Sequence, residues 1–280
     1  MGVVNVTPDS FSDGGLFLDA GAAIVHAREL IGEGAEIVDV GGESTRPGAE
    51  PVSAAEELRR VLPVVEGIAA ADTGAQVSID TSKAVVARAC VEAGATLVND
   101  VSALRADPGM VGLVAESGVE CCLMHMRGEP RTMQADPRYD DVVDDVRSFL
   151  EERMVDAVRE GVSEQRIMLD PGIGFGKTLA HNLALLARLD ELTSLGRPLV
   201  VGTSRKSFIG RILADAAGQT EPVAAAERLE GTIATNVLAY ERGASVFRVH
   251  DVAPVRAALA VAAATLGARW DPGQTRTPTR

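Results

Sequence analysis

The chain has 280 residues, 46% of them hydrophobic, which is enough for the buried core of one large domain. Its formal net charge of −13 and its aromatic content of 3% argue against a basic nucleic-acid-binding face and against stacking platforms for single strands. No segment approaches the roughly 18 uninterrupted apolar residues of a membrane span, and the first residues do not have the pattern of a signal peptide.

Eight short β-rich runs recur along the chain, separated by Ala-rich segments with apolar residues at helical spacing. The predicted strands are, in chain order, 2–5, 36–40, 76–80, 96–101, 120–125, 166–170, 198–202 and 245–250. Alternation of strands and helices indicates a parallel sheet. Eight such units favour closure into a single (β/α)8 TIM barrel, expected over residues 1–268, rather than an open doubly wound sheet.

Turn and cap residues lie between these runs. Ser53 with Glu56 three residues later predicts a capping box at the start of a helix. Gly-Ala pairs at 34–35, 94–95 and 243–244 predict helix ends, because glycine suits the left-handed residue that closes a helix.

Three long or polar stretches, 6–18, 41–51 and 126–139, each follow a predicted strand. Barrel enzymes keep their sites on that side of the sheet, and long loops there are often lids. The final segment, 269–280, is rich in Pro, Thr and Arg and is expected to be a disordered tail.

Three polar side chains each end an apolar run: Asp80, Asn99 and Asp170. Helix capping explains any one of them equally well. Three such residues around one barrel mouth favour a shared polar ligand, because a partly desolvated carboxylate needs a partner. Two carboxylates and one carboxamide suit a flat heterocycle with an N–C–N edge, which gives a carboxylate two parallel hydrogen bonds.

A basic set accompanies these acids: Arg46, Lys206, Arg248 and His250. Arg248 and His250 alternate along one predicted strand, so both side chains point to the same side. The forked donors of arginine suit phosphate, and the last two strands of a barrel often frame a phosphate site. The pattern therefore predicts a phosphate or pyrophosphate site.

The glycine-rich segment 172–178 is not a nucleotide P-loop, because the position that requires the first glycine is Pro171. ATP binding is therefore rejected. The glycines instead predict a loop that approaches a ligand closely, with Phe175 as a packing surface.

The sequence also lacks the patterns that are typical of a metal site or of covalent catalysis. His125 has no second histidine at ligand spacing, so no zinc site is expected. Cys90, Cys121 and Cys122 show no metal spacing and are interpreted as reduced core thiols of a cytoplasmic protein. Without a nucleophile elbow, the site is expected to work by positioning and charge stabilisation.

Two segments carry a family resemblance: 1–15, MGVVNVTPDSFSDGG, and 39–48, DVGGESTRPG. They resemble the signatures of the dihydropteroate synthase family of folate biosynthesis, and the match runs from Gly2 to about Val252. The resemblance implies a transferase that joins a dihydropterin methyl diphosphate to p-aminobenzoate and releases pyrophosphate, with Mg²⁺. It also implies a cytoplasmic homodimer with small-molecule substrates, without nucleic acid or membrane as a partner.

The resemblance also implies roles for single residues. The pterin would be held by Asp80, Asn99, Asp170 and Lys206, with Met124 packed against its ring. The diphosphate would be held by Asn5, Arg46, Arg248 and His250, with Asn5 also at Mg²⁺. The p-aminobenzoate pocket, where sulfonamides would compete, would be formed by Phe11, Thr45, Pro47, Phe175, Ser204 and Lys206. Catalysis would fall to Asp80, Lys206, Arg248 and His250, through a cation formed as diphosphate leaves and through ordering of the loops.

One departure from the family pattern lies near the pterin. The family often has Gly-Gly after segment 99–102, where this chain has Ala103-Leu104.

Two alternatives stay open at this point. A pterin-dependent methyltransferase-type barrel shares the carboxylate edge but does not need segments 45–47 and 204–206. A non-catalytic paralogue would bind pterins, or a partner protein, without turnover.

Overall fold

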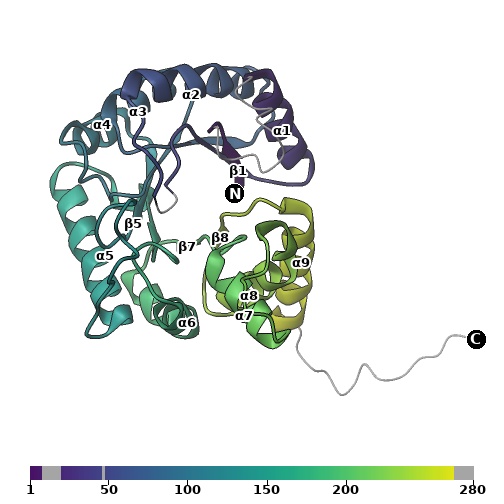
Figure 1. Cartoon of the computed structure of the whole chain (residues 1–280). Helices are drawn as coiled ribbons and strands as arrows, with labels where there is room; N and C mark the ends of the chain where they lie inside the picture. The colour runs from purple at the N-terminus through teal and green to yellow at the C-terminus, as the bar shows by residue number, and fades with distance from the viewer. Residues whose placement is uncertain (8–19, 46–47, 268–280) are drawn as a thin grey trace, which may run out of the picture.

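The computed structural model describes residues 1–7, 20–45 and 48–267. Within these residues, eight parallel strands form the centre of the molecule (Figure 1). They are β1 (Gly2–Asn5), β2 (Ile37–Gly41), β3 (Gln76–Asp80), β4 (Leu97–Asp100), β5 (Glu120–Met124), β6 (Ile167–Asp170), β7 (Val200–Val201) and β8 (Val246–Phe247).

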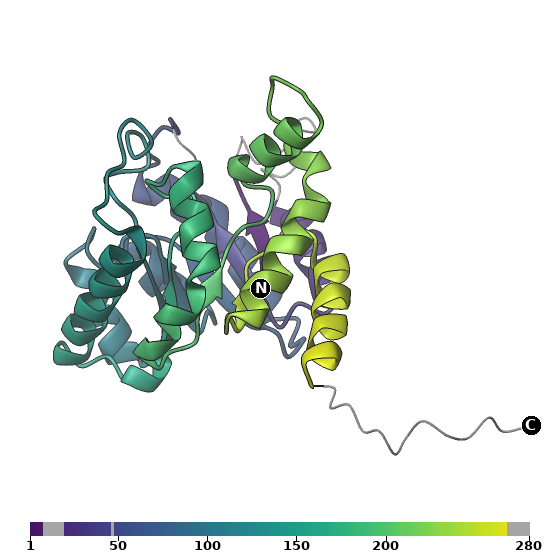
Figure 2. The ribbon, with the colours of Figure 1, turned by 90° about the horizontal axis from the view of Figure 1, so that it is seen from below.

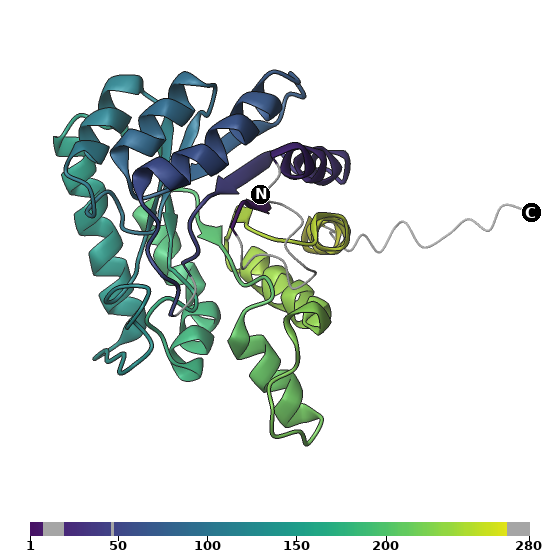
Figure 3. The ribbon, with the colours of Figure 1, turned by 45° about the horizontal axis from the view of Figure 1, so that its top comes forward.

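Helices surround the strands, as three views show (Figures 1, 2 and 3). The α-helices are α1 (Ala20–Gly32), α2 (Ala54–Ala69), α3 (Ala84–Glu92), α4 (Gly109–Ser117), α5 (Val142–Arg159), α6 (Leu179–Ala187), α7 (Ser207–Ala216), α8 (Leu229–Glu241) and α9 (Val252–Gly267). Short 3-10 turns are η2 (Glu164–Arg166), η3 (Leu189–Leu195) and η4 (Ala225–Glu227). In the described part of the chain, none of the helices has the length and apolar content to cross a bilayer.

The ring of strands closes through two seams. Strands β1 to β6 form one continuous parallel sheet, and β7 pairs with β8. Single bridges join Leu169 to Leu199 and Gly2 to Val249, and the amide of Val3 donates to the Val249 carbonyl at 3.0 Å. The predicted (β/α)8 barrel is therefore confirmed.

The predicted strands all occur, but the last two are shorter than expected. The predicted ranges 198–202 and 245–250 contain ladders of only two residues, Val200–Val201 and Val246–Phe247. A ladder requires a partner at each residue, and both strands border a seam that has a single bridge.

The cap predictions are confirmed in part. Ser53 accepts from the amide of Glu56 at 3.3 Å, as expected. The Glu56 side chain does not complete the capping box, because it binds two arginines of its own helix instead. The three predicted helix-closing glycines, Gly34, Gly94 and Gly243, have φ angles of 98°, 116° and 92°.

The last helix returns to the first. The amide of Ala253, in α9, donates to the Glu33 carboxylate at 3.2 Å, just after α1. The core lies between the strands and the helices and is built from branched aliphatic side chains such as Val38, Ile79 and Val98. Most of the predicted loop 6–18 and the predicted tail 269–280 lie outside the described residues.

Candidate active site

The polar strand ends gather at the carboxyl end of the barrel. Asp80 ends β3, Asn99 is the penultimate residue of β4, and Asp170 ends β6. Asp80 and Asn99 are direct neighbours in the parallel register. The charges of Lys206 and Arg248 both act on Asp170, so the predicted acidic and basic sets share one mouth.

Arg248 joins the two sets through a carboxylate that the sequence reasoning missed. Its Nη2 donates to Asp80 Oδ2 at 2.8 Å, and its Nε donates to Asp39 Oδ2 at 2.6 Å. Asp39, in the middle of β2, is completely buried. The one available signal was a charged residue inside an apolar strand, which needs a partner.

Asp39 also fixes the orientation of Asn99. Its carboxylate accepts from Ser78 Oγ at 2.6 Å and from Asn99 Nδ2 at 3.0 Å. An ionised carboxylate only accepts hydrogen bonds, so the amide nitrogen of Asn99 must face it. Asp39 therefore orients one residue of each predicted subsite, Asn99 and Arg248.

Asp80 and Asp170, the two carboxylates at strand ends, have raised pKa values. Burial raises the pKa of Asp80 to about 7, against the opposing charge of Arg248. Burial also raises the pKa of Asp170, although Lys206 and a 2.7 Å hydrogen bond from the Gly172 amide oppose the shift. Carboxylates with shifted pKa values in a cleft are typical of functional sites.

Lys206 faces the glycine-rich loop after β6. Its Nζ donates to the Ile173 carbonyl and lies 4.4 Å from the centre of the Phe175 ring. Burial lowers the pKa of Lys206 to about 8, with Asp170 opposing. The structure thus brings together two residues that were both expected at p-aminobenzoate.

Met124 lies beside this loop in a small apolar cluster. It packs with Met126 and Met133, and Val101 and Phe175 cover the group. Flexible thioether side chains suit contact with a planar ring, in line with the role expected of Met124.

Ser204 and His250 contact each other across the ends of β7 and β8. Ser204 Oγ lies 2.9 Å from His250 Nδ1 and accepts from the His250 amide at 3.2 Å. Next to them, Arg205 makes two hydrogen bonds to Asp251, at 3.0 and 2.6 Å. Ser204, expected in the p-aminobenzoate pocket, thus lies directly against a residue expected at the diphosphate.

Asn5 ends β1, the strand that the seam joins to the segment after β8. Gly41 is the register partner of both Asn5 and Asp80. A Cβ on Gly41 would lie 3.6 Å from Asp80 Oδ2 and 3.7 Å from Asn5 Oδ1, so both side chains border this glycine. Across residues 1–7, 20–45 and 48–267, no cluster of three His, Cys, Asp or Glu side chains forms a ready metal site.

The loop after β2 borders a groove of about 330 Å³ next to Thr7, with Ser44 and Arg60 among its lining residues. Thr45 is half-buried in the same loop. Phe11, Arg46 and Pro47, also expected in the site, lie outside the described residues.

A second charge cluster, in which only Glu57 is completely buried, anchors that loop. Lys83 Nζ contacts the carboxylates of Glu43 and Glu57 at 2.6 and 2.5 Å. Glu43 also accepts from the Val52 amide at 2.8 Å and so closes the base of the loop. Glu57 was missed because it occupies a core position of α2, where sequence periodicity predicts an apolar residue.

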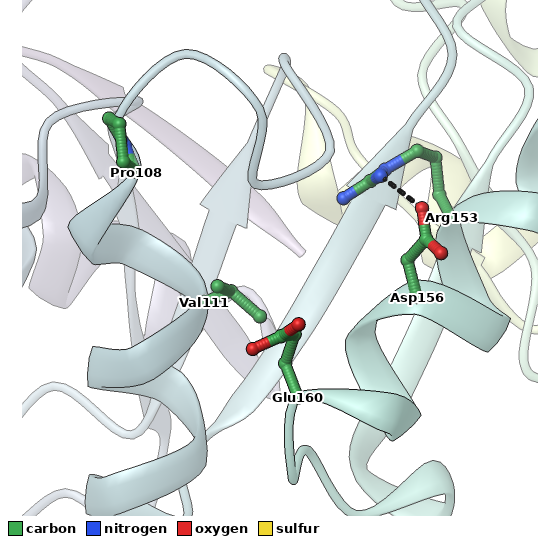
Figure 4. A pocket seen from close by; sticks show the side chains of 5 residues that line it. All are labelled: Pro108, Val111, Arg153, Asp156 and Glu160. Carbon is green, nitrogen blue, oxygen red and sulfur yellow. Dashed lines mark hydrogen bonds and ion pairs between the residues drawn. The ribbon is translucent and has the colours of Figure 1, made fainter.

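A groove of about 430 Å³ lies elsewhere, on the outside of the barrel between α4 and α5 (Figure 4). Its lining includes Arg153, which donates to the Ala103 carbonyl at 3.1 Å and to Asp156 at 2.8 Å. Ala103 and Leu104 have φ angles of 54° and 61°, so this loop keeps a conformation that glycine adopts without strain.

Comparison with known proteins gives consistent matches. A family model described as "Pterin binding enzyme" matches residues 1–250. A dihydropteroate synthase of Escherichia coli (strain K12) is 48% identical over 269 residues, which cover 96% of this chain and 92% of that protein. A dihydropteroate synthase of Bacillus subtilis (strain 168) is 47% identical over 252 residues, which cover 90% of this chain and 83% of that protein.

Solved structures agree. The Yersinia pestis dihydropteroate synthase in complex with a sulfonamide drug matches with a TM-score of 0.89 at 45% identity, covering 96% of this chain and 94% of that chain. The Xanthomonas albilineans dihydropteroate synthase with 4-aminobenzoic acid matches with a TM-score of 0.87 at 46% identity, covering 96% and 93%.

Proposed function

The chain belongs to the pterin binding enzyme family, and we propose that it is a transferase that catalyses the dihydropteroate synthase reaction. It would condense (7,8-dihydropterin-6-yl)methyl diphosphate with p-aminobenzoate to give 7,8-dihydropteroate and pyrophosphate. One observation carries this proposal: Arg248 contacts the Asp80 carboxylate directly, at the mouth where Asn99, one residue before the end of β4, and Asp170, at the end of β6, also lie.

The acidic strand ends suit the pterin ring. Asp170 presents a buried carboxylate to the N–C–N edge, where charge-assisted hydrogen bonds are strong. Asn99 is held by Asp39, so its carboxamide meets the ring in one orientation. Met124 and its neighbours offer an apolar surface to the ring face.

The basic residues suit the departing diphosphate. As the bond between the pterin methylene and the diphosphate oxygen breaks, the oxygen keeps the electron pair, and Arg248 and His250 would stabilise the growing negative charge. Asp80, in its ionised form, would stabilise the cation left on the pterin methylene. The p-aminobenzoate nitrogen then attacks that carbon and releases a proton.

Water must be excluded while the cation exists, because water would otherwise capture it. Phe175 and Lys206 border the expected p-aminobenzoate side, and the loop anchored by Glu43 borders the mouth from β2. Sulfonamides would compete with p-aminobenzoate at this position.

The proposal includes Mg²⁺ at Asn5. A Cβ on Gly41 would lie 3.7 Å from Asn5 Oδ1, and Mg²⁺ usually takes one or two protein oxygens together with substrate phosphates. Asn5 would hold the ion, which would neutralise diphosphate charge when bound.

The proposal also includes a cytoplasmic location and a homodimer. The three cysteines, Cys90, Cys121 and Cys122, are buried free thiols, which suits a reducing compartment. Sedimentation velocity of the purified protein would test the dimer directly.

Turnover separates this proposal from a non-catalytic pterin binder. The purified protein, given both substrates and Mg²⁺, should release pyrophosphate and form dihydropteroate in equal amounts. Pterin binding without pyrophosphate release would indicate the non-catalytic alternative instead.

The Asp170→Asn variant tests the ring-binding role. We expect its pterin affinity to weaken by about 1.5–3 kcal/mol, the usual contribution of a hydrogen bond to a charged group. Asp190→Asn, on the exposed turn η3, is the matched control and should bind pterin like the wild type. Wild-type affinity of Asp170→Asn in calorimetry would contradict the assignment.

A further inference from the structure

Lysine is rare in this chain and occurs at selected places. Of the 27 Lys and Arg residues, only Lys83, Lys177 and Lys206 are lysines. All three follow the carboxyl end of a strand, β3, β6 or β7. Lys83 and Lys206 have contacts described above, whereas none of the roles assigned so far involves Lys177.

The Nζ of Lys177 lies inside a cage of hydrogen-bond acceptors. Its distances are 2.9 Å to the Gly172 carbonyl, 3.0 Å to the Phe175 carbonyl and 2.9 Å to His125 Nδ1. The His125 carbonyl lies at 3.4 Å. The side chain is only 3% exposed, so these protein atoms replace water around it.

Three short contacts match the three N–H groups of an ammonium ion. Burial, and then the charge of Lys177, lower the pKa of His125 to about 2, so its imidazole is neutral and Nδ1 can accept. Burial and the charge of Lys206 lower the pKa of Lys177, and the charge of Asp170 opposes this shift. Hydrogen bonds to acceptors favour the ammonium form. A planar guanidinium does not offer three donors from one atom, which explains a lysine at this position.

The glycine loop, defined as residues 172–176, passes very close to the end of β5. A Cβ on Gly172 would lie 1.9 Å from the His125 carbonyl oxygen, and one on Gly176 would lie 2.4 Å from that of Arg127. The carbonyls of His125, Gly172 and Phe175 all lie within 3.4 Å of Lys177 Nζ. The Gly172 carbonyl also accepts from the Phe175 amide at 3.0 Å. Buried carbonyls without a donor are costly, and Lys177 supplies a donor to those of His125 and Phe175.

Other contacts hold different parts of this loop. Tyr139 donates to the Gly176 carbonyl at 2.8 Å, and the Gly174 amide donates to Asn182 at 2.7 Å. Lys177 instead binds the carbonyls of Gly172 and Phe175, which flank the part of the loop that faces Lys206.

We propose that Lys177 is a positioning residue that pins the glycine loop to His125 and thereby sets Phe175 against Lys206 at the p-aminobenzoate side of the site. This inference rests on the proposed function. Asp80 and Asn99 are held separately, by Arg248 and Asp39. Asp170 accepts from the Gly172 amide of the loop itself, so the pterin affinity should also fall without Lys177, but less than the affinity for p-aminobenzoate.

The first test is the variant Lys177→Met, which keeps most of the length of the side chain but removes its donors. We expect KM for p-aminobenzoate to rise about tenfold or more, with a much smaller change in kcat and in the pterin Kd measured by calorimetry. Tyr139→Phe, which removes one contact at the far end of the loop, is the matched control and should change KM far less. An unchanged KM, or an equal loss of pterin affinity, in folded Lys177→Met would overturn the proposal.

Chemical complementation gives a second readout. Lys177→Ala leaves space for a three-carbon amine, so added propylammonium should lower KM for p-aminobenzoate toward the wild-type value. Propan-1-ol, which has a similar size but no charge, should not. Lys177→Met fills the space and should not respond to the amine; equal effects of amine and alcohol would contradict a role for the ammonium group.

Hydrogen exchange separates this inference from the proposed function. Without substrates, amides of the glycine loop should exchange faster in Lys177→Met than in the wild type. If the wild type makes no dihydropteroate, the proposed function fails. The exchange data still test whether Lys177 holds the glycine loop in place. If the wild type is active and loop exchange in Lys177→Met is unchanged, the proposed positioning role of Lys177 is wrong.

Discussion

Arg248 connects the expected pterin and diphosphate subsites. Its guanidinium group contacts Asp80 and Asp39 at the same time, and Asp39 in turn holds Asn99. The partners of Arg248 lie 209 and 168 positions away in the sequence. Sequence reasoning predicted Arg248, Asp80 and Asn99 from strand ends, but only the closed barrel reveals that Asp39 joins them.

The pH dependence of catalysis follows from two shifted groups. Asp80, with a pKa raised to about 7, must be ionised to stabilise a cation, so kcat/KM should fall as the pH drops below about 7. Lys206, with a pKa lowered to about 8, should lose its proton and its contribution above that pH. We expect a bell-shaped profile, measured as kcat/KM for the pterin substrate.

Two controls accompany the pH profile. Asp80→Asn should shift the acidic limb, to which Asp170, whose pKa burial also raises, still contributes. ¹³C labelling of the three lysines should show the Lys206 side chain titrating near pH 8. A profile that is flat from pH 6 to pH 9 would rule out both assignments.

The stability of the fold should also respond to Asp80. Because its pKa is raised on folding, its contribution to the free energy of unfolding is fully present below its unfolded pKa of about 4 and is lost as the pH rises through about 7. The difference in urea stability between the wild type and Asp80→Asn should therefore fall over this range. A constant difference would contradict the raised pKa.

At the scale of elements, helix α2 carries a charge into the core to hold the loop after β2. Glu57 is completely buried, and Lys83, at the start of α3, contacts it together with Glu43. Lys83→Met leaves the Glu57 charge buried without this partner, so we expect a loss of about 3–5 kcal/mol in urea unfolding. The double variant Lys83→Met, Glu57→Gln should recover part of that loss; equal stability of Lys83→Met and the wild type would contradict this account.

The connection after β4 holds two non-glycine residues at positive φ. Asp100 supports it by accepting from the amides of Ser102 and Leu104 at 2.8 and 2.9 Å. Ala103→Gly should leave the stability within about 0.5 kcal/mol of the wild type, since relief of about 1 kcal/mol of strain is offset by the entropy of the unfolded chain and by the loss of one buried methyl group, worth about 0.8 kcal/mol. Leu104→Gly should destabilise the protein, because it removes a larger buried side chain. A large loss of stability in Ala103→Gly would show that the strain argument is wrong.

Element prediction succeeded where local pattern decides structure and failed where distant partners decide it. Strand β3 has the predicted bounds, Gln76–Asp80, because an apolar run ends there in a polar residue. The ladders of β7 and β8 are shorter than predicted because their extent depends on neighbours across the seams. The Glu56 amide donates to the Ser53 cap as predicted, but the Glu56 side chain binds Arg59 and Arg60, one turn later in the helix.

At the scale of the whole molecule, the fold brings basic side chains to an acidic mouth. The chain has a net charge of −13, and Lys206, Arg248 and His250 lie in the segments that follow β7 and β8, beside the carboxylates of β2, β3 and β6. Eight βα units were enough to predict the barrel, and barrel geometry was enough to place these residues at one end. The contacts of Lys177 and Asp39 were not predictable, because they depend on the packing of segments distant in sequence.

A crystal structure of the protein soaked with the dihydropterin methyl diphosphate tests the central claim most directly. We predict the ring edge within hydrogen-bond distance of Asp170 and Asn99, with the diphosphate against Arg248 and His250. Density for the substrate anywhere else, for example in the outer groove between α4 and α5, would contradict the account.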